Sequence, residues 1–203
     1  MDFVASLFPH TASGWVVQIV ISFIASYFLL SLMEYLLHRF VMHGVLSDLV
    51  YKVAPFIKTL HEDHLKHHQT YSTYFNKPTI EEYKDLNLKL GLQHSAMGTV
   101  CLLPYFIVTL LLVGALPTII FCLFALMHNL AWNFIHAEMH DPRNRQWSHS
   151  RPFKFLAEYH YLHHHHPSQR FNIVCPLFDW LVGSVNNPTV ADLHDIERLG
   201  FLK

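Results

Sequence analysis

Charge is scarce in this chain, and it is missing altogether from two long stretches. Lys, Arg, Asp and Glu make up only 14% of the 203 residues, and the formal net charge is −1. Because no basic stripe is available to follow the phosphates of a nucleic acid, we expect no nucleic-acid partner. Residues 3–33 and 90–137 contain none of the four charged residue types. Together with a hydrophobic content of 52%, this predicts a membrane protein.

Cysteine and glycine motifs are also missing. The three cysteines, Cys101, Cys122 and Cys175, form no CxxC pair, which excludes the thiolate sites of zinc fingers, c-type haem and iron–sulfur clusters. Their odd number and wide spacing argue against a disulfide framework, so we interpret all three as buried thiols. No glycine-rich nucleotide loop occurs either. A redox reaction would therefore need electrons from a separate protein.

The uncharged stretches have the length of membrane-crossing helices. The first begins at Trp15 and is long enough for a hydrocarbon core of ~30 Å. As one helix, residues 90–137 would measure about 72 Å, so the chain must turn back, and the sequence GALP at Gly114–Pro117 is the natural hairpin. We predict an all-α, multi-pass membrane protein with a single domain, residues 1–203. Its three transmembrane helices are expected at about 15–36, 95–113 and 117–133.

Three crossings would place the end of the first and the end of the third on the same side of the membrane. All 14 Lys and Arg residues also fall in the segments on that side. By the positive-inside rule this side is cytoplasmic, at the endoplasmic reticulum in a eukaryote or the inner membrane in a bacterium. We expect a cytoplasmic helical cap at about residues 37–90 and 136–185, followed by a polar tail at 186–203.

Histidine is the residue that the chain has in excess, with 18 histidines against 14 Lys and Arg. Ten of them form four short motifs on the side predicted to be cytoplasmic: His38 and His43; His64, His67 and His68; His136 and His140; His160, His163 and His164.

The spacing HxxHH occurs in two of the motifs. At ~100° per residue, it directs three imidazoles from one face of a helix, which is how a helix presents several nitrogens to one metal. His38 and His43 are instead ~140° apart on an α-helix, so they converge only if the helix unwinds near His43. His165 and His166 project away from the arc of their motif, and Pro167 ends the helix, so we expect these two to be bystanders.

Ten imidazoles are too many for one ion but suit two ions with about five ligands each. Imidazole is a good ligand for iron, copper, zinc and nickel. Because neutral imidazole adds no negative charge, two divalent ions would leave about four positive charges, which neighbouring carboxylates could offset. No catalytic residue beyond the metal ligands is predicted. The candidates for an outer layer around the ligands are His61, His128, Glu34, Asp63, Glu138, Asp141 and Glu158.

The four motifs, HRFVMH, HLKHH, HAEMH and HYLHH, resemble the histidine boxes of the fatty acid hydroxylase and sterol desaturase superfamily. The segment after the last motif, HHPSQRFNIVCPLFDWLVGS, also resembles that superfamily, and the resemblance covers about Glu34 to Ser184. It implies an integral-membrane, non-haem di-iron oxygenase that has all ten histidines as ligands. The chain departs from the pattern in having three expected crossings where members usually have four. In addition, Pro78 lies further from the second box than is common.

The function expected from these features is dioxygen-dependent hydroxylation of an unactivated C–H bond in a lipid of fatty acyl, sphingolipid or sterol-like type. The lipid would lie among the helices, and zinc could replace iron in purified protein. A lipid desaturase or a carotenoid ring hydroxylase is the alternative, and HRFVMHG resembles the second of these. A metal transporter is a further alternative, but it would need ligands along the crossings. The sequence does not predict the oligomeric state.

Overall fold

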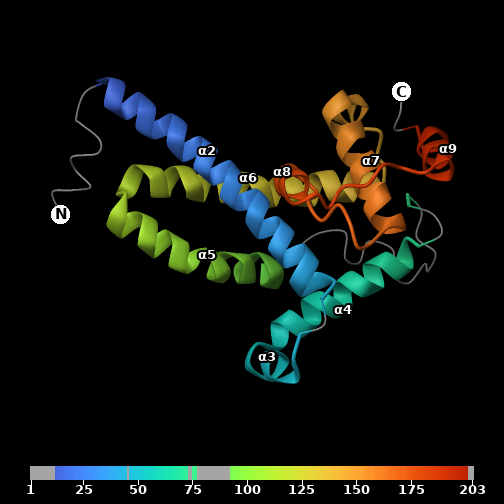
Figure 1. Ribbon diagram of the computed structural model, residues 1–203, viewed down its shortest axis with the longest axis horizontal. Helices are drawn as coiled ribbons and strands as arrows, with labels where there is room; N and C mark the ends of the chain where they lie inside the picture. Colours follow the sequence, from blue (N-terminus) through green and yellow to red (C-terminus); the bar gives the residue numbers. More distant parts are fainter. Residues whose placement is uncertain (1–11, 45, 73–74, 77–91, 201–203) are drawn as a thin grey trace.

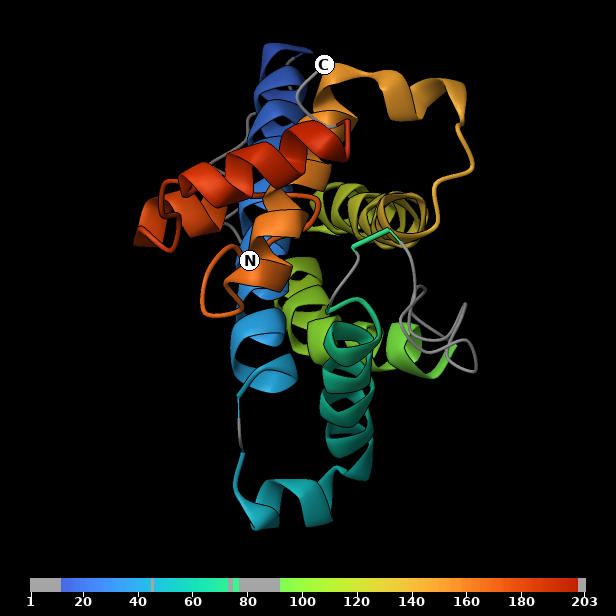
Figure 2. The same cartoon turned by 90° about the vertical axis from the view of Figure 1, so that its right-hand side faces the viewer.

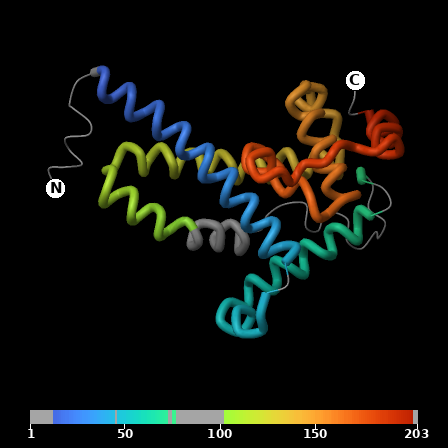
Figure 3. Tube along the Cα trace, viewed as in Figure 1, coloured from blue at the N-terminus to red at the C-terminus, as the bar shows by residue number. Residues whose placement is uncertain are grey.

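The computed structural model describes residues 12–44, 46–72, 75–76 and 92–200, without the side chains of residue 12 and residues 92–101. Within these ranges the regular secondary structure is entirely helical and there is no strand, as predicted (Figure 1, Figure 3). The elements are α2 (Ala12–Leu36), η1 (Leu37–Met42), α3 (Asp48–Val53), α4 (Pro55–Thr70), α5 (Leu92–Leu112), α6 (Ala115–His140), η3 (Gln146–His149), α7 (Arg151–His165), α8 (Leu177–Val182) and α9 (Val190–Arg198).

Two stretches of helix are long and apolar enough to cross a membrane, Ser13–Met42 and Ala115–His140. Only 28% and 22% of their most apolar stretches are buried inside the protein, whereas the core helix of a soluble protein would be mostly buried. Val16, Ile24 and Met127, for example, are 60%, 66% and 67% exposed. Such a large exposed apolar surface is stable only against another apolar surface, and a bilayer provides one.

The third predicted crossing corresponds to α5, which has 21 residues and contains Pro104. Its described apolar part is Leu102–Leu112, which is shorter than a span. The third crossing therefore stays a prediction. The predicted hairpin is confirmed, since Gly114 separates α5 from α6 with a φ of 100°, a conformation that glycine adopts without strain.

Helices α2 and α6 cross and pack against each other, and α5 lies beside α6 (Figure 1, Figure 2). The face of α2 that is turned inward carries small polar residues, among them the buried Ser22 and Ser26. The Ser22 hydroxyl donates to the carbonyl of Gln18 at 2.7 Å, so this polar group is satisfied within its own helix. The edge of Phe23 meets the ring of Phe124 at 5.0 Å and closes the contact between the two helices.

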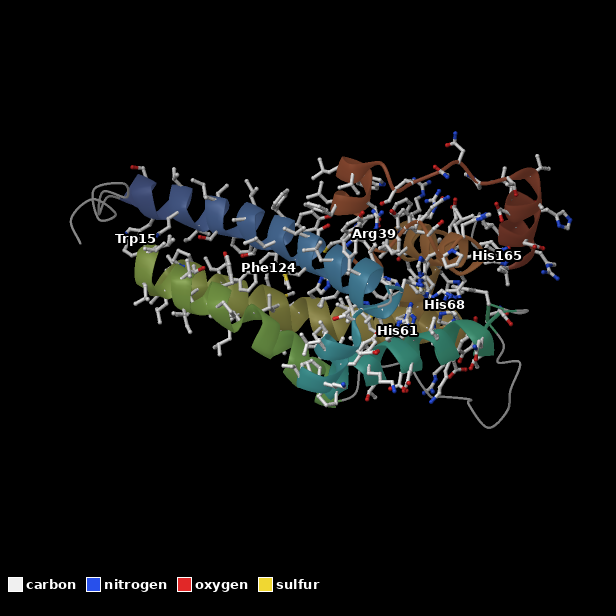
Figure 4. The ribbon with its side chains drawn as sticks, turned by 60° about the horizontal axis from the view of Figure 1, so that its bottom comes forward. Trp15, Arg39, His61, His68, Phe124 and His165 are labelled. Carbon is white, nitrogen blue, oxygen red and sulfur yellow. The ribbon has the colours of Figure 1, made fainter. Side chains whose placement is uncertain are left out.

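The molecule has an apolar end and a polar end. The turn between α5 and α6 and the start of α2 lie together at one end, and α4, α7 and α9 lie at the other (Figure 1). Figure 4 shows mainly carbon around Trp15, whereas nitrogen and oxygen gather around His68 and His165. All four histidine motifs lie at the polar end, as the predicted topology requires.

A small core joins α6, α7 and α9 at the polar end. Met139, Ala157 and Ile196 are completely buried in it. Part of the expected polar tail at 186–203 is thus the folded helix α9. This helix is started by a capping box between Thr189 and Asp192, and it packs against α7 through Ile196.

The prediction of three buried thiols is also only partly right. Cys175 is buried, but Cys122 lies exposed on the apolar surface of α6. The side chain of Cys101 lies outside the described residues. An exposed thiol is compatible with the sequence pattern because an apolar face turned toward lipid has the same composition as a buried one.

Candidate metal centre

Nine of the ten predicted histidines come together at the polar end in two neighbouring groups, and the tenth, His136, stands beside one of them. The nitrogen atoms that could bind a metal ion lie within 4.8 Å of one another in each group. The His38 group consists of His38, His43, His64, His68 and His163. The His140 group consists of His67, His140, His160 and His164, with His136 in contact with three of these rings.

In the His38 group the Nε2 atoms point to a common centre. The Nε2 of His64 lies 3.1 Å from that of His38 and 2.8 Å from that of His43. The Nε2 of His68 lies 3.1 Å from it as well. A neutral imidazole has only one N–H, so His64 cannot form a good hydrogen bond with all three neighbours at once. A cation at the centre would replace the repulsion between the facing lone pairs with coordination bonds.

In the His140 group, too, the Nε2 atoms lie close to one another. The Nε2 atoms of His140 and His160 are 3.0 Å apart, and those of His67 and His164 are 3.1 Å apart. The ring of His136 lies 4.7 to 4.9 Å from the rings of three members of the group. His136 is also buried and packs on Trp132 at 4.4 Å. It thus stands beside the four nitrogen atoms that converge in this group.

The helices α4 and α7 lie between the two groups and contribute to both. On α4, His64 and His68 belong to the His38 group, and His67 belongs to the His140 group. On α7 the assignment is reversed, since His163 belongs to the His38 group while His160 and His164 belong to the other. In each motif the pair four residues apart goes to one group, because residues i and i+4 share a helix face. The rings of His68 and His164 stack at 4.1 Å where the groups meet.

A π-helical turn brings His38 and His43 to the same side. The helix α2 continues as η1, in which the N–H of His43 bonds to the carbonyl of His38, five residues earlier, at 3.1 Å. In such a turn residues five apart lie above one another, so their rings stack at 5.1 Å. The sequence predicted convergence through unwinding of the helix; the structure achieves it by widening one turn.

Backbone carbonyls fix the orientation of three of the imidazoles. The Nδ1 atoms of His163 and His140 lie 2.7 Å and 2.6 Å from the carbonyl oxygens of Gln169 and Phe75. His38 makes the same kind of contact with the carbonyl of Phe171. Since a carbonyl can only accept, each Nδ1 must carry the proton, and each Nε2 of the neutral ring keeps its lone pair. That tautomer is the one that binds a metal through Nε2.

Burial keeps the imidazoles neutral at physiological pH. Burial, together with a smaller effect of neighbouring imidazoles, lowers the pKa of His43 to about 4 and that of His163 to about 3. The same causes lower the pKa of five other members outside the candidate spans: His64, His67, His68, His160 and His164. Uncharged imidazole is the form that coordinates metal ions, so both groups are prepared to bind cations.

The seven residues predicted for an outer layer lie around the groups, and several of them bond to loops or to neighbouring charged side chains. Glu34 accepts hydrogen bonds from the backbone N–H groups of the loop at 173–175, and His128 lies between Glu34 and the Cys175 thiol, 3.8 Å and 3.6 Å away. The Nδ1 of His61 bonds to the carbonyl of Met42 at 2.7 Å.

The other carboxylates of this set serve neighbouring loops or the surface. Glu138 is buried and forms an ion pair with Arg145 at 3.0 Å, and Asp141 pairs with Arg143 at 3.1 Å. Asp63 and Glu158 are half-buried, and burial raises the pKa of Glu158. For His38, His140 and His163 the group next to Nδ1 is a backbone carbonyl rather than one of these carboxylates.

Sequence reasoning missed the role of Asp179. This carboxylate is completely buried and accepts from the backbone N–H groups of Phe171 and Asn172 at 3.0 Å and 2.6 Å. The signal was present in the segment PLFD, where an acidic residue stands inside an apolar run. A buried charge of this kind needs several donors, so it indicates a loop that folds over it.

His165 and His166 lie outside both groups, as predicted. His166 contacts the carboxylate of Asp192 at 3.1 Å, and His165 stands 3.7 Å from the same carboxylate. Burial alone would raise the pKa of Asp192, but hydrogen bonds from His166 and Thr189 lower it. Instead of facing the other imidazoles, this pair connects the end of α7 to the start of α9.

No family model matches this chain, and no curated protein or solved structure matches it.

Proposed function

We propose that this chain is a membrane-bound enzyme that uses two iron ions and dioxygen to hydroxylate an unactivated C–H bond of a lipid. The observation that carries the proposal is the pair of adjacent, all-imidazole groups at one end of the candidate membrane spans. The resemblance of the four motifs to the histidine boxes of the fatty acid hydroxylase and sterol desaturase superfamily supports the same reaction class.

The donor set fits two metal ions. Each group offers at least four Nε2 atoms from neutral, buried rings, and the groups touch at His68 and His164. Iron is among the metals that imidazole binds well, although zinc competes for such sites. Bound iron would supply the activation of dioxygen. The ten histidines would hold the ions, and the carbonyls of Phe75, Gln169 and Phe171 would orient three of the rings.

The protein itself keeps bulk water away from one side of the site. Met139 and Leu162 are almost completely buried on the helices that carry His140 and His163. A dry environment prevents loss of reactive species to solvent. This arrangement suits chemistry on a C–H bond, because water would otherwise consume the reactive species.

A lipid is the substrate class that the surroundings favour. The apolar faces of α2 and α6 lead directly to the end that carries the histidines (Figure 4). On α8, Trp180 and Leu181 are 54% and 60% exposed, and Phe178 connects this helix to Phe28 of α2 at 5.5 Å. In the proposed topology α5 is a third crossing, the histidine end is cytoplasmic, and α8 lies at the membrane surface.

The proposal needs a separate electron donor, because the reaction consumes electrons and the sequence offers no nucleotide loop, haem motif or cysteine cluster. A desaturase would use the same site and differ only in its product. A metal transporter is disfavoured because both groups lie at one end of the candidate spans rather than along them. These alternatives define what the experiment must separate.

The experiment combines metal analysis with lipid analysis. The full-length chain is expressed in cells, and membrane lipids are compared by mass spectrometry with those of cells that carry His163→Ala. We expect hydroxylated lipids, 16 mass units heavier, only with the unchanged chain, and about two metal ions per purified chain. His165→Ala, next to the motif but outside both groups, is the matched control and should retain both signals.

Products that are 2 mass units lighter would instead identify a desaturase. Full metal content with no change in any lipid would contradict the enzyme proposal. Retention of the product by His163→Ala would contradict the assignment of the site.

A further inference from the structure

We propose that the two histidine groups bind metal in a fixed order, the His38 group first and more tightly, because one buried loop orients that group before metal arrives. The inference rests on the proposed function only in that both groups bind metal. It concerns the loop at residues 169–175, which connects α7 to α8 and takes no part in the coordination.

The loop orients two rings of the His38 group at once. The carbonyl of Gln169 accepts from His163 at 2.7 Å, and the carbonyl of Phe171 is the partner of His38. Between them stands Arg170, whose φ of 57° is in the left-handed region that non-glycine residues rarely adopt. The kink at Arg170 lets carbonyls two residues apart reach rings from two different helices, α7 and η1.

The kinked conformation is held by contacts of Arg170 itself. Its N–H donates to the carbonyl of Ser184 at 3.0 Å, and its guanidinium donates to the carbonyl of Asn186. The guanidinium also lies over the ring of Tyr159, 4.9 Å from the centroid. These contacts keep an unfavourable backbone conformation in place, which is typical of a segment whose geometry serves a neighbouring site.

Two buried carboxylates fix the rest of the loop. Asp179 accepts from the N–H groups of Phe171 and Asn172, and Ser184 donates to it at 2.5 Å. Glu34 accepts from the N–H groups of residues 173–175 at 3.0 to 3.2 Å. Since Glu34 and His38 are one helical turn apart on α2 and η1, the same helix that presents His38 also holds the loop that orients it.

The His140 group has much less of this support. Of the rings of His67, His140, His160 and His164, only that of His140 bonds to a carbonyl, that of Phe75, within the described residues. Within the part of the chain that the structure describes, the Nδ1 atoms of His67, His160 and His164 are buried and have no hydrogen-bond partner. Their tautomers are therefore not set in advance. Binding through Nε2 would leave a buried N–H unsatisfied on each of these rings, and that cost weakens the binding of metal.

A hydrogen bond from the ring nitrogen that does not bind the metal typically raises the metal affinity of an imidazole site 10- to 100-fold. The His38 group has two such bonds, whereas among His67, His140, His160 and His164 there are one such bond and three Nδ1 atoms without a partner. This contrast predicts a difference in Kd of at least about 10-fold between the two sites. The first ion would bind to the His38 group and the second to the His140 group.

The test is a titration of the full-length, metal-free protein in detergent with Co²⁺, followed by visible absorption and by metal analysis. We expect two steps with separated midpoints. His43→Ala should remove the tight step, and His140→Ala should remove the weak one. Asp179→Asn should weaken the tight step about 10- to 100-fold and alter its absorption spectrum, while the weak step stays unchanged. Ser184→Ala, which removes one donor to Asp179, should cause a smaller change in the same step.

Glu138→Gln is the matched control. Glu138 is as buried as Asp179, but it holds Arg143 and Arg145 rather than the loop at 169–175, so the tight step should be unchanged. Circular dichroism and Tm establish that each variant is folded. Two ions bound in one step, or equal weakening of both steps by Asp179→Asn and Ser184→Ala, would overturn the order of binding. Failure to bind two ions at all would overturn the proposed function, and the order with it.

Discussion

The Nε2 atoms of His43 and His163 lie 3.0 Å apart, although 120 positions separate the two residues in the sequence. One comes from the end of the first candidate span and the other from a helix near the end of the chain. Neither ring can hold its position without the segments that bring them together, namely η1, α4, α7 and the loop at 169–175. Metal binding by these two rings therefore depends on the stability of the whole polar end.

The anchoring of the loop by Glu34 predicts a large effect on stability. In Glu34→Gln an amide NH₂ would replace one of the carboxylate oxygens, so at least one buried N–H of the loop would lose its acceptor. We expect a loss of about 1–3 kcal/mol in the free energy of unfolding for each donor left unsatisfied. Thermal unfolding of the unchanged protein and of Glu34→Gln in detergent measures this loss of stability.

Glu62→Gln is the matched control for this carboxylate. Glu62 is 52% exposed and only forms a 3.6 Å pair with Lys58, so its replacement should change the free energy by less than about 0.5 kcal/mol. Equal effects of the two substitutions would contradict a structural role for Glu34.

The π-helical turn at η1 predicts that Gly44 cannot carry a side chain. A Cβ added to Gly44 would lie 2.2 Å from the carbonyl oxygen of Phe40, which is backbone and cannot rotate away. Gly44→Ala should therefore displace the end of the turn and with it His43. We expect at least about 10-fold weaker metal binding by the His38 group, measured by Co²⁺ titration. Ser47→Ala is the control, since its exposed side chain makes no capping bond; normal binding by Gly44→Ala would show that the turn does not position His43.

The helix α9 is expected to stabilise α7 through Ile196. Because Ile196 is completely buried, Ile196→Ala should cost about 2–5 kcal/mol through lost burial and the cavity that remains. Val190→Ala, at a side chain that is 85% exposed in the same helix, should cost less than about 0.5 kcal/mol. Thermal unfolding compares the two variants, and a similar small effect of both would mean that α9 is not part of the folded core.

Acid should destabilise the metal-free protein. The pKa of His43 is lowered to about 4 and that of His163 to about 3 by burial, against about 6.5 in the unfolded chain. Between these values the unfolded state binds more protons than the folded state, so stability is complete above pH 6.5 and falls as pH decreases toward 3. In this range each such histidine contributes a slope of up to about 1.4 kcal/mol per pH unit. Measuring Tm from pH 7.5 to 4.5 tests this expected loss of stability. A Tm that rises on acidification would contradict the neutral state of the imidazoles in the two histidine groups.

Much of the architecture was readable from local patterns. Uncharged stretches identified α2 and α6, and GALP identified the turn at Gly114. The HxxHH spacing identified helices at α4 and α7, but the prediction that all three rings of a motif serve one metal is wrong, because each motif divides its rings between the two groups. Such features depend on helix period and on residues close in sequence. The helix α9 could have been found in the same way, because Thr189 and Asp192 form a capping box, but its polar composition concealed the single buried position at Ile196.

The sequence by itself determined that ten histidines lie on one side of a mostly apolar helical protein, and that two of their motifs present several rings from one helix face. Only the tertiary structure decided how the ten divide into groups, because the division depends on how α4 and α7 cross between η1 and α6. It also decided that the carbonyls of Gln169 and Phe171, rather than the carboxylates that the sequence suggested, face the rings of His163 and His38. Every residue has a carbonyl, so sequence cannot distinguish the few that point at an imidazole; their direction is set by the path of a folded loop.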